Sequence, residues 1–165
     1  MIFREVPITP PMLERAHELA TQLGSLKNSI REGEGNLVGF LGEQCFLAAF
    51  PKATRENSFD FDIRLGDKRL EVKTKDRTVR PQPDFEVSVS AYNKSQKADY
   101  YVFVSLFRQG RVFYRGYLLG FMKPAEYLMS ASFLREGMID PSNQFTVRAS
   151  CYNLPIHKLN RFTVR

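Results

Sequence analysis

Two stretches near the start of the chain have the apolar spacing of helices. Over residues 11–27, apolar side chains recur at steps of three and four, with proline at the beginning and Gly24 near the end, which predicts an amphipathic helix. Over residues 37–51 most positions are apolar, and Asn36 can cap this segment at its beginning. Because a helix that is apolar on most sides packs inside a protein, we expect the second helix to be buried.

After residue 57 the period of the pattern changes to two, which is typical of strands. Alternation and β-prone residues cover residues 59–64, 70–73, 85–89, 100–107 and 111–119. The last two segments are separated by a turn at Gln109 and Gly110, so we expect them to pair as a hairpin.

The remaining segments give weaker signals. Residues 90–97 predict a short polar helix or loop, residues 124–129 a short helix, residues 145–149 a strand and residues 156–159 a last apolar segment. The order helix, strand, strand, strand, helix, strand predicts an α/β sandwich in which helices flank a central mixed sheet. The pattern leaves the order of the strands in the sheet open.

Gly66 and Asp67 stand between the first two predicted strands. A glycine at the first central position suits a two-residue hairpin turn, and counting outward from this turn defines a register. The register pairs Leu65 with Lys68, Arg64 with Arg69, Asp62 with Glu71 and Asp60 with Lys73. It places the apolar residues of both strands on one face, and the acids and Lys73 on the other.

The predicted pairing of Asp62 with Glu71 places two like charges about 5 Å apart, which destabilises a sheet. A strand with a purely structural role would gain from lysine or threonine at either position, so we expect a positive group between the two carboxylates. Carboxylate oxygens suit Mg²⁺, which keeps several waters and completes its shell with phosphate oxygens.

Glu43 is an acid on an apolar face of the second predicted helix. It shares a stripe with Phe40, Leu47 and Phe50. Burying a carboxylate without a partner costs free energy, so Glu43 either reaches an edge of the core or contributes to a charged site.

These residues resemble the motif of the PD-(D/E)XK, or restriction-endonuclease-like, nucleases. The resemblance spans Val38 to Phe107, is similar to small phage and prokaryotic members, and implies a restriction-endonuclease-like αβββαβ core with C-terminal additions. The matching residues are Gly39-Phe40-Leu41-Gly42-Glu43, Phe61-Asp62-Ile63 and Glu71-Val72-Lys73. Phe61 stands where the family has proline.

The resemblance implies a role for each charged residue of the motif. Asp62 and Glu71 would hold Mg²⁺ or Mn²⁺, Glu43 would bind the metal directly or through water, and Lys73 would orient the attacking water and offset phosphate charge. Asp60 is a rival for the role of Asp62, but it lies further from Glu71 along the hairpin and precedes an aromatic residue instead of an aliphatic one.

Further polar residues follow the motif. Many relatives carry a polar helix residue that faces the site, and Gln96 is the candidate for this auxiliary catalytic group; the alternative is a solvated side chain. Lys75, Arg77 and Arg80 continue the Lys73 strand into a loop, and with Lys94 they are candidate nucleic-acid contacts.

A net charge of +6 and a pI near 9.4 permit a polyanionic partner. The expected partner is DNA, in double-stranded, branched or single-stranded form, and a homodimer would allow both strands to be cut. Several tyrosines could stack on unpaired bases, although packing within strands is the more common role. The alternatives are a non-catalytic nucleic-acid-binding protein that retains the fold and an interaction module whose acids form ordinary ion pairs.

The remaining composition narrows the class of protein. A length of 165 residues suits one domain, residues 1–165. No apolar run approaches the roughly 18 residues of a membrane span, and the start of the sequence lacks the pattern of a secretion signal. We therefore expect a protein of the cytoplasm, and the resemblance implies a prokaryotic or phage-infected cell. His17, His157 and the two cysteines have no zinc-site spacing.

Overall fold

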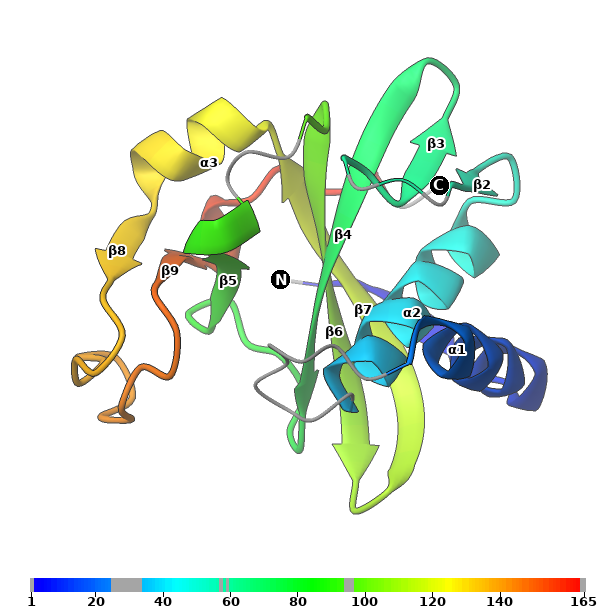
Figure 1. The fold of residues 1–165 in the computed structure, drawn as a ribbon, viewed down its shortest axis with the longest axis horizontal. Helices are drawn as coiled ribbons and strands as arrows, with labels where there is room; N and C mark the ends of the chain where they lie inside the picture. Colours follow the sequence, from blue (N-terminus) through cyan, green and yellow to red (C-terminus); the bar gives the residue numbers. More distant parts are fainter. Residues whose placement is uncertain (1, 25–33, 57, 59, 94–96, 164–165) are drawn as a thin grey trace.

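The computed structural model describes residues 2–24, 34–56, 58, 60–93 and 97–163 (Figure 1). Along the chain, the elements are β1 (Arg4–Pro7), α1 (Pro10–Leu23), α2 (Glu34–Ala49), β2 (Thr54–Arg55), β3 (Ile63–Leu65), β4 (Lys68–Arg77), β5 (Glu86–Ser90), η1 (Ala91–Asn93), β6 (Tyr100–Gln109), β7 (Val112–Met122), α3 (Pro124–Ser130), β8 (Ser132–Leu134), β9 (Cys151–Pro155) and η2 (Ile156–Lys158). Within the described ranges, no helix is both long and apolar enough to cross a membrane.

The central layer is a six-stranded mixed sheet with the order β1-β7-β6-β4-β3-β2. Strands β4 and β6 are parallel, and the other neighbours are antiparallel. Helices α1 and α2 lie on one side of this sheet, and a three-stranded sheet with the order β5-β9-β8 lies with α3 on the other side (Figure 1). The predicted α/β class with a central mixed sheet is confirmed.

The parallel pairing of β4 with β6 requires a crossover connection. Residues 78–99 make this connection, and they contain β5 and the short helix η1. The third predicted strand is therefore present, but it leaves the central sheet and pairs with β9 in the second sheet. Its alternating pattern predicts a half-buried strand and carries no information about which sheet the strand joins.

The apolar side chains of β4 belong to one of the two hydrophobic clusters in the described part of the protein. Leu70 and Val72 belong to the cluster beneath α1 and α2, and their parallel neighbours in β6 are Tyr100 and Val102. The opposite face carries the cluster shared with the second sheet, which includes Tyr101, Tyr127, Leu154 and Ile156. Burying a side chain of this size contributes about 1.5–3 kcal/mol, so Leu70 and Val72 hold β4 against the helical layer.

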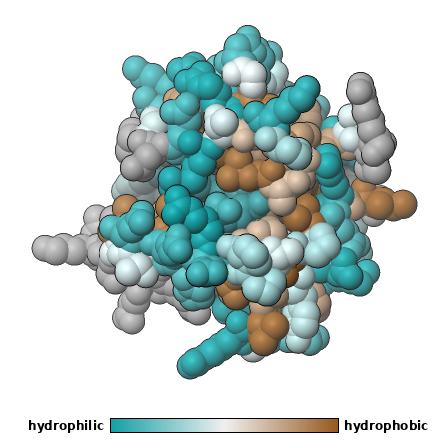
Figure 2. All heavy atoms as spheres, turned by 90° about the vertical axis from the view of Figure 1, so that its right-hand side faces the viewer, coloured by the Kyte–Doolittle hydropathy of each residue, from teal (hydrophilic) through white to brown (hydrophobic). Residues whose placement is uncertain are grey.

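Helix α2 approaches β4 closely because two glycines lie at the contacts. A methyl group on Gly42 would overlap the side chain of Thr74, and one on Gly116 of β7 would overlap Cys45 of α2. The absence of these methyl groups lets the helix settle onto the sheet. This contact brings the residue after Gly42, which is Glu43, to the level of β4. The outer side of the helical layer has a band of apolar atoms between hydrophilic ones (Figure 2).

Two local predictions are wrong. Helix α2 begins at Glu34, so Asn36 lies inside its first turn, where its side-chain amide donates a hydrogen bond to the Gly24 carbonyl (2.9 Å) at the end of α1. Residues 145–149 form no strand and contain only one bridge, between Thr146 and Ile139. Hydrogen bonds within the turn around Asp140 determine the backbone here, and the strand that follows is β9.

Candidate functional site

The hairpin of β3 and β4 forms around the predicted turn. Gly66 has φ +61°, a conformation that costs little only for glycine. The ladder pairs Leu65 with Lys68, Arg64 with Arg69 and Ile63 with Leu70, as the register predicts. The Asp62 amide then donates to the Leu70 carbonyl (2.9 Å), which extends the same register toward Glu71.

The predicted pairing of Asp60 with Lys73 does not form. The chain bends before β3, and the Asp60 carboxylate accepts a long hydrogen bond from the Lys97 amide (3.4 Å). Of the two candidate aspartates, Asp62 is therefore the one that the hairpin brings against Glu71.

The Asp62 carboxylate lies over the hairpin backbone, where its Oδ2 accepts a hydrogen bond from the Val72 amide (2.8 Å). Burial, followed by the charges of Glu71 and Glu43, raises the pKa of Asp62 to about 8, although the Val72 bond and Lys73 act in the opposite direction. A group at this position therefore keeps its proton at neutral pH unless more positive charge is supplied.

Glu71 and Lys73 lie two residues apart on one face of β4. The Lys73 ammonium is 2.8 Å from Glu71 Oε1, and both side chains are largely buried. The second oxygen, Glu71 Oε2, is buried and has no hydrogen-bond partner among the described residues. A buried carboxylate oxygen without a partner is costly, so this atom is suited to accept a ligand.

Tyr101 covers this pair from the neighbouring strand β6, where it is opposite Glu71 in the parallel ladder. The Lys73 ammonium lies 5.9 Å from the centre of its ring. The Tyr101 hydroxyl is buried without a hydrogen-bond partner in the described part of the chain. Burial raises the pKa of Tyr101, and the Glu71 charge adds to the effect. The sequence analysis missed Tyr101 in this role, because its position depends on the pairing of β4 with β6.

Glu43 approaches the hairpin from α2 and is only 5% exposed. Its Oε2 accepts a hydrogen bond from Arg55 Nε (2.9 Å), and the Arg55 guanidinium stacks on Phe40 at 5.2 Å. Burial raises the pKa of Glu43 to about 7 even though Arg55 lowers it, and the Glu71 charge also raises it. Sequence reasoning missed Arg55, since a single basic residue in the two-residue strand β2 carries no motif.

The four charged groups of the predicted motif influence one another electrostatically. The charges of Glu43, Glu71 and Lys73 shift the pKa of Asp62, and the charge of Glu71 shifts the pKa of Glu43. Helix α2, the residue before β3 and strand β4 thus bring three carboxylates and one ammonium into a common region. We call Glu43, Asp62, Glu71 and Lys73 the acidic cluster.

The fit of a metal ion to the acidic cluster can be judged from its oxygens. In the described ranges, no three His, Cys, Asp or Glu side chains gather into a metal-binding group. Mg²⁺, however, is commonly bound through one or two carboxylates, with waters and substrate phosphates completing its shell. Asp62 and the partnerless Oε2 of Glu71 supply such a pair of hard ligands. Glu43 already forms an ion pair with Arg55.

The predicted nucleic-acid contacts lie in different places. Lys75 and Arg77 share the face of β4 that carries Lys73 and line one cavity, and Lys75 also lines a second cavity together with Lys73. Arg80 is exposed and lines a separate hollow of about 320 Å³ with Tyr117. Gln96 and Lys94 lie outside the described residues.

The chain was compared with known proteins by sequence and by structure. No protein-family model, no curated protein and no solved structure matches it.

Proposed function

We propose that this protein is a metal-dependent nuclease of the PD-(D/E)XK type that hydrolyses phosphodiester bonds of DNA, with a restriction-endonuclease-like core. The observation that carries the proposal is the acidic cluster itself. Burial and mutual repulsion raise the pKa values of two of its carboxylates to about 7 and 8, and a strained arrangement of this kind marks functional sites more often than structural ones.

Each member of the acidic cluster has a role in this proposal. Asp62 and Glu71 would hold Mg²⁺ or Mn²⁺, with Glu43 contributing directly or through water. A bound divalent cation supplies Lewis acidity toward the scissile phosphate. Lys73, which lies 2.8 Å from Glu71, would orient the attacking water and stabilise the charge that grows on the phosphoryl oxygens.

The order of elements supports the proposed fold. Apart from the two-residue strand β2, helix α2, strands β3, β4 and β5, the short helix η1 and strand β6 follow one another in the order of the αβββαβ core. The chain departs from this core in three respects: β2 is inserted after α2, β5 joins the second sheet, and η1 has only three residues.

The test is cleavage of supercoiled, linear, branched and single-stranded DNA with Mg²⁺, with Mn²⁺ and with EDTA. We expect cleavage only with metal, and a loss of at least about 100-fold in Glu71→Gln and in Lys73→Met. Glu126→Gln and Lys123→Met are matched controls, because both residues are exposed at the start of α3. Folded wild-type protein that cuts none of these substrates with either metal would contradict the proposal.

One observation favours a second candidate, a nucleic-acid-binding protein without catalysis. Arg55 already supplies a positive charge to Glu43, at 2.9 Å, and an arginine in the site can replace the charge of a metal. This candidate predicts salt-sensitive DNA binding that is unaffected by Mg²⁺ and by Glu71→Gln. Under the nuclease proposal, binding at the site instead strengthens with Ca²⁺ or Mg²⁺.

A further inference from the structure

The polar face of β4 continues past the acidic cluster toward the end of the strand. Because side chains alternate along a strand, Lys73, Lys75 and Arg77 point to the same face. Neighbours in this row are about 6.6 Å apart, which is comparable with the separation of successive phosphates along an extended nucleic-acid strand. The row therefore presents cations at the spacing of one backbone.

Two adjoining cavities follow this row. The first, of about 520 Å³, is lined by Lys73 and Lys75 from β4 and by Val87 and Ser88 from β5. The second, of about 660 Å³, is lined by Lys75 and Arg77, by β5 and by the loop at residues 140–145. Both cavities include Lys75 and Asp76, so together they form one groove between the central sheet and the second sheet.

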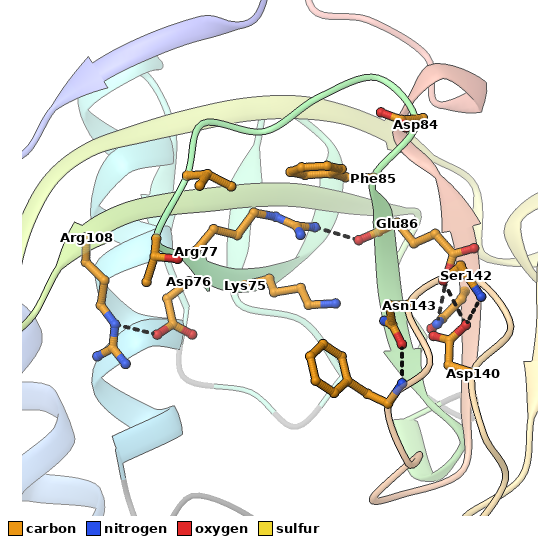
Figure 3. A pocket seen from close by; sticks show the side chains of 14 residues that line it. Lys75, Asp76, Arg77, Asp84, Phe85, Glu86, Arg108, Asp140, Ser142 and Asn143 are labelled. Carbon is orange, nitrogen blue, oxygen red and sulfur yellow. Dashed lines mark hydrogen bonds and ion pairs between the residues drawn. The ribbon is translucent and has the colours of Figure 1, made fainter.

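The groove is lined by charges of both signs, and Lys75 is the cation best placed to meet an anion. Figure 3 shows the Lys75 ammonium extended into the middle of the larger cavity, and Lys75 has no ion pair or hydrogen bond with any other described residue. Four acids among the described residues line this cavity. Asp76 is paired with Arg108 (2.9 Å), Glu86 accepts a hydrogen bond from Asn153 (3.0 Å), Asp140 accepts two from Ser142, and Asp84 is exposed. Desolvation and the charge of Arg77 lower the pKa of Lys75, and the charges of Glu86 and Asp140 oppose them.

Arg77 is the second residue of the groove with a nitrogen donor that lacks a hydrogen-bond partner among the described residues. Its Nη2 donates to the Glu86 carbonyl (2.6 Å), and its guanidinium stacks on Phe85 at 5.1 Å. This arrangement fixes the direction of the side chain (Figure 3). Its Nε is buried and has no hydrogen-bond partner within the described chain.

The groove ends at an exposed aromatic ring. Phe145 lines the larger cavity and is 74% exposed. Its backbone is held in place, because its amide donates to Asn143 Oδ1 (2.9 Å) and its carbonyl accepts from the Asp140 amide (2.8 Å). An exposed ring on a held backbone, beside a row of cations, resembles the combination that single-strand-binding proteins use to stack unpaired bases.

The size of the groove argues against a duplex. Cavities of roughly 300–1,000 Å³ hold ligands of drug size, which is also the size of a nucleotide. The groove is closed on one side by the central sheet and on the other by β5 and the 140–145 loop, so a base pair with both of its backbones exceeds the available space.

We propose that this groove binds one unpaired strand of DNA, with Lys75 and Arg77 contacting its phosphates and Phe145 stacking on a base. The inference rests on the proposed nuclease function for the direction of the strand, which runs along β4 toward the acidic cluster. It specifies the substrate class: single-stranded DNA, or a duplex with an unpaired tail long enough to enter the groove.

The test separates binding from cleavage. Fluorescence anisotropy in EDTA, where a metal-dependent nuclease is inactive, compares a labelled single-stranded oligonucleotide with a blunt duplex of the same sequence. We expect the single strand to bind at least about tenfold more tightly. Phe145→Ala should weaken single-strand binding about tenfold and leave duplex binding unchanged, and Lys75→Ala should weaken it and reduce its dependence on salt.

Matched controls are available on the same molecule. Phe133→Ala removes an aromatic ring that is 49% exposed in β8, away from the groove, and Lys123→Ala removes an exposed lysine at α3; both should bind the single strand as the wild type does. Equal affinity for the two DNA forms, or unchanged single-strand affinity in both groove variants, would contradict the proposal that the groove binds an unpaired strand. Single-strand binding that depends on Lys75 and Phe145, in a protein that never cleaves, would overturn the nuclease proposal and leave the groove in place.

Discussion

The two faces of β4 differ in how their side chains are satisfied. On the face toward α1 and α2, Leu70 and Val72 are buried among apolar neighbours that fill the space around them. On the opposite face, Glu71 and Tyr101 are equally buried, yet each has a polar atom without a hydrogen-bond partner among the described residues. The helical face has such an atom too, Thr74 Oγ1 beside Gly42, but it belongs to a hydroxyl, which carries no charge. One strand thus carries a largely apolar core on one side and a region of buried charges on the other.

This difference separates stability from function. Side chains that only support the fold are expected to have their polar atoms paired, because each unpaired buried group costs about 1–3 kcal/mol. A region that keeps unpaired buried groups makes the fold less stable, and we expect a bound ligand to pair with these groups and restore that stability. Substitutions on the two faces should therefore have opposite effects on folding, and the following predictions test this, from the largest effect to the smallest.

The largest effect is expected on the helical face of the hairpin. Ile63 is completely buried next to Leu70, and Ile63→Ala should lower the free energy of unfolding by about 2–5 kcal/mol through lost transfer energy and a cavity. Ile139→Ala is the matched control, since Ile139 is 54% exposed, and it should cost less than about 1 kcal/mol. Urea denaturation measures both, and equal losses would show that the hairpin is not part of the core.

A smaller effect is expected from pH, and it acts on the polar face. The pKa values of Glu43 and Asp62 are raised from 4.5 and 3.8 to about 7 and about 8, so the folded state binds their protons more tightly than the unfolded state. Their contribution to stability is therefore complete below about pH 4 and is lost as the pH rises through 7 and 8. Since one pKa unit corresponds to about 1.4 kcal/mol, we expect a decrease of a few kcal/mol in EDTA.

Thermal unfolding at pH 5, 7 and 9 measures this decrease. The double variant Glu43→Gln, Asp62→Asn lacks both titrating groups and should show a flatter profile. Mg²⁺ or Mn²⁺ should stabilise the wild type more at pH 9 than at pH 5, because metal binding requires the deprotonated carboxylates. Stability that rises between pH 5 and pH 8 in EDTA would contradict the assignment of raised pKa values.

The hairpin shows how much of the site could be predicted from the sequence. The Gly66 turn and the alternation on either side determine the register locally, so the approach of Asp62 to Glu71 followed from neighbours within ten residues. Glu43 could be identified as an anomaly because a buried acid on an apolar stripe needs either a partner or an edge of the core. Both inferences depend on patterns within a short stretch of sequence, which the periodicity of strands and helices reveals.

Contacts between distant segments could not be predicted in this way. The placement of Tyr101 over Glu71 depends on the parallel pairing of β4 with β6, which joins residues thirty positions apart. The Arg55 partner of Glu43 and the transfer of β5 to the second sheet likewise depend on the whole fold. An alternating pattern indicates that a strand has two faces, but it does not identify the strand beside it.

A third prediction concerns the charge of Glu71 and is smaller again. Glu71→Gln removes the charge that repels Asp62 and Glu43, while the amide oxygen can still accept a hydrogen bond from Lys73. We expect the metal-free protein to gain about 1 kcal/mol of stability at pH 8, and the stabilisation by Mg²⁺ to disappear. A variant that loses stability in EDTA and still gains from Mg²⁺ would show that Glu71 has a structural role only.

The smallest effect compares two buried tyrosines whose rings lie edge to face at 5.7 Å. The Tyr127 hydroxyl lies 2.6 Å from the Tyr152 carbonyl, to which it donates a hydrogen bond, whereas the Tyr101 hydroxyl has no such partner in the described chain. Tyr127→Phe should therefore lower the free energy of unfolding by about 1 kcal/mol, and Tyr101→Phe should leave it unchanged or raise it by less than that. Tyr101→Phe removes the hydroxyl, whose pKa the nearby Glu71 charge raises, so the same substitution should reduce DNA cleavage although it leaves the fold intact. Urea denaturation and a cleavage assay on both variants separate the two roles: a Tyr101→Phe protein that is destabilised as much as Tyr127→Phe, with cleavage unchanged, would place Tyr101 with the core and not with the acidic cluster.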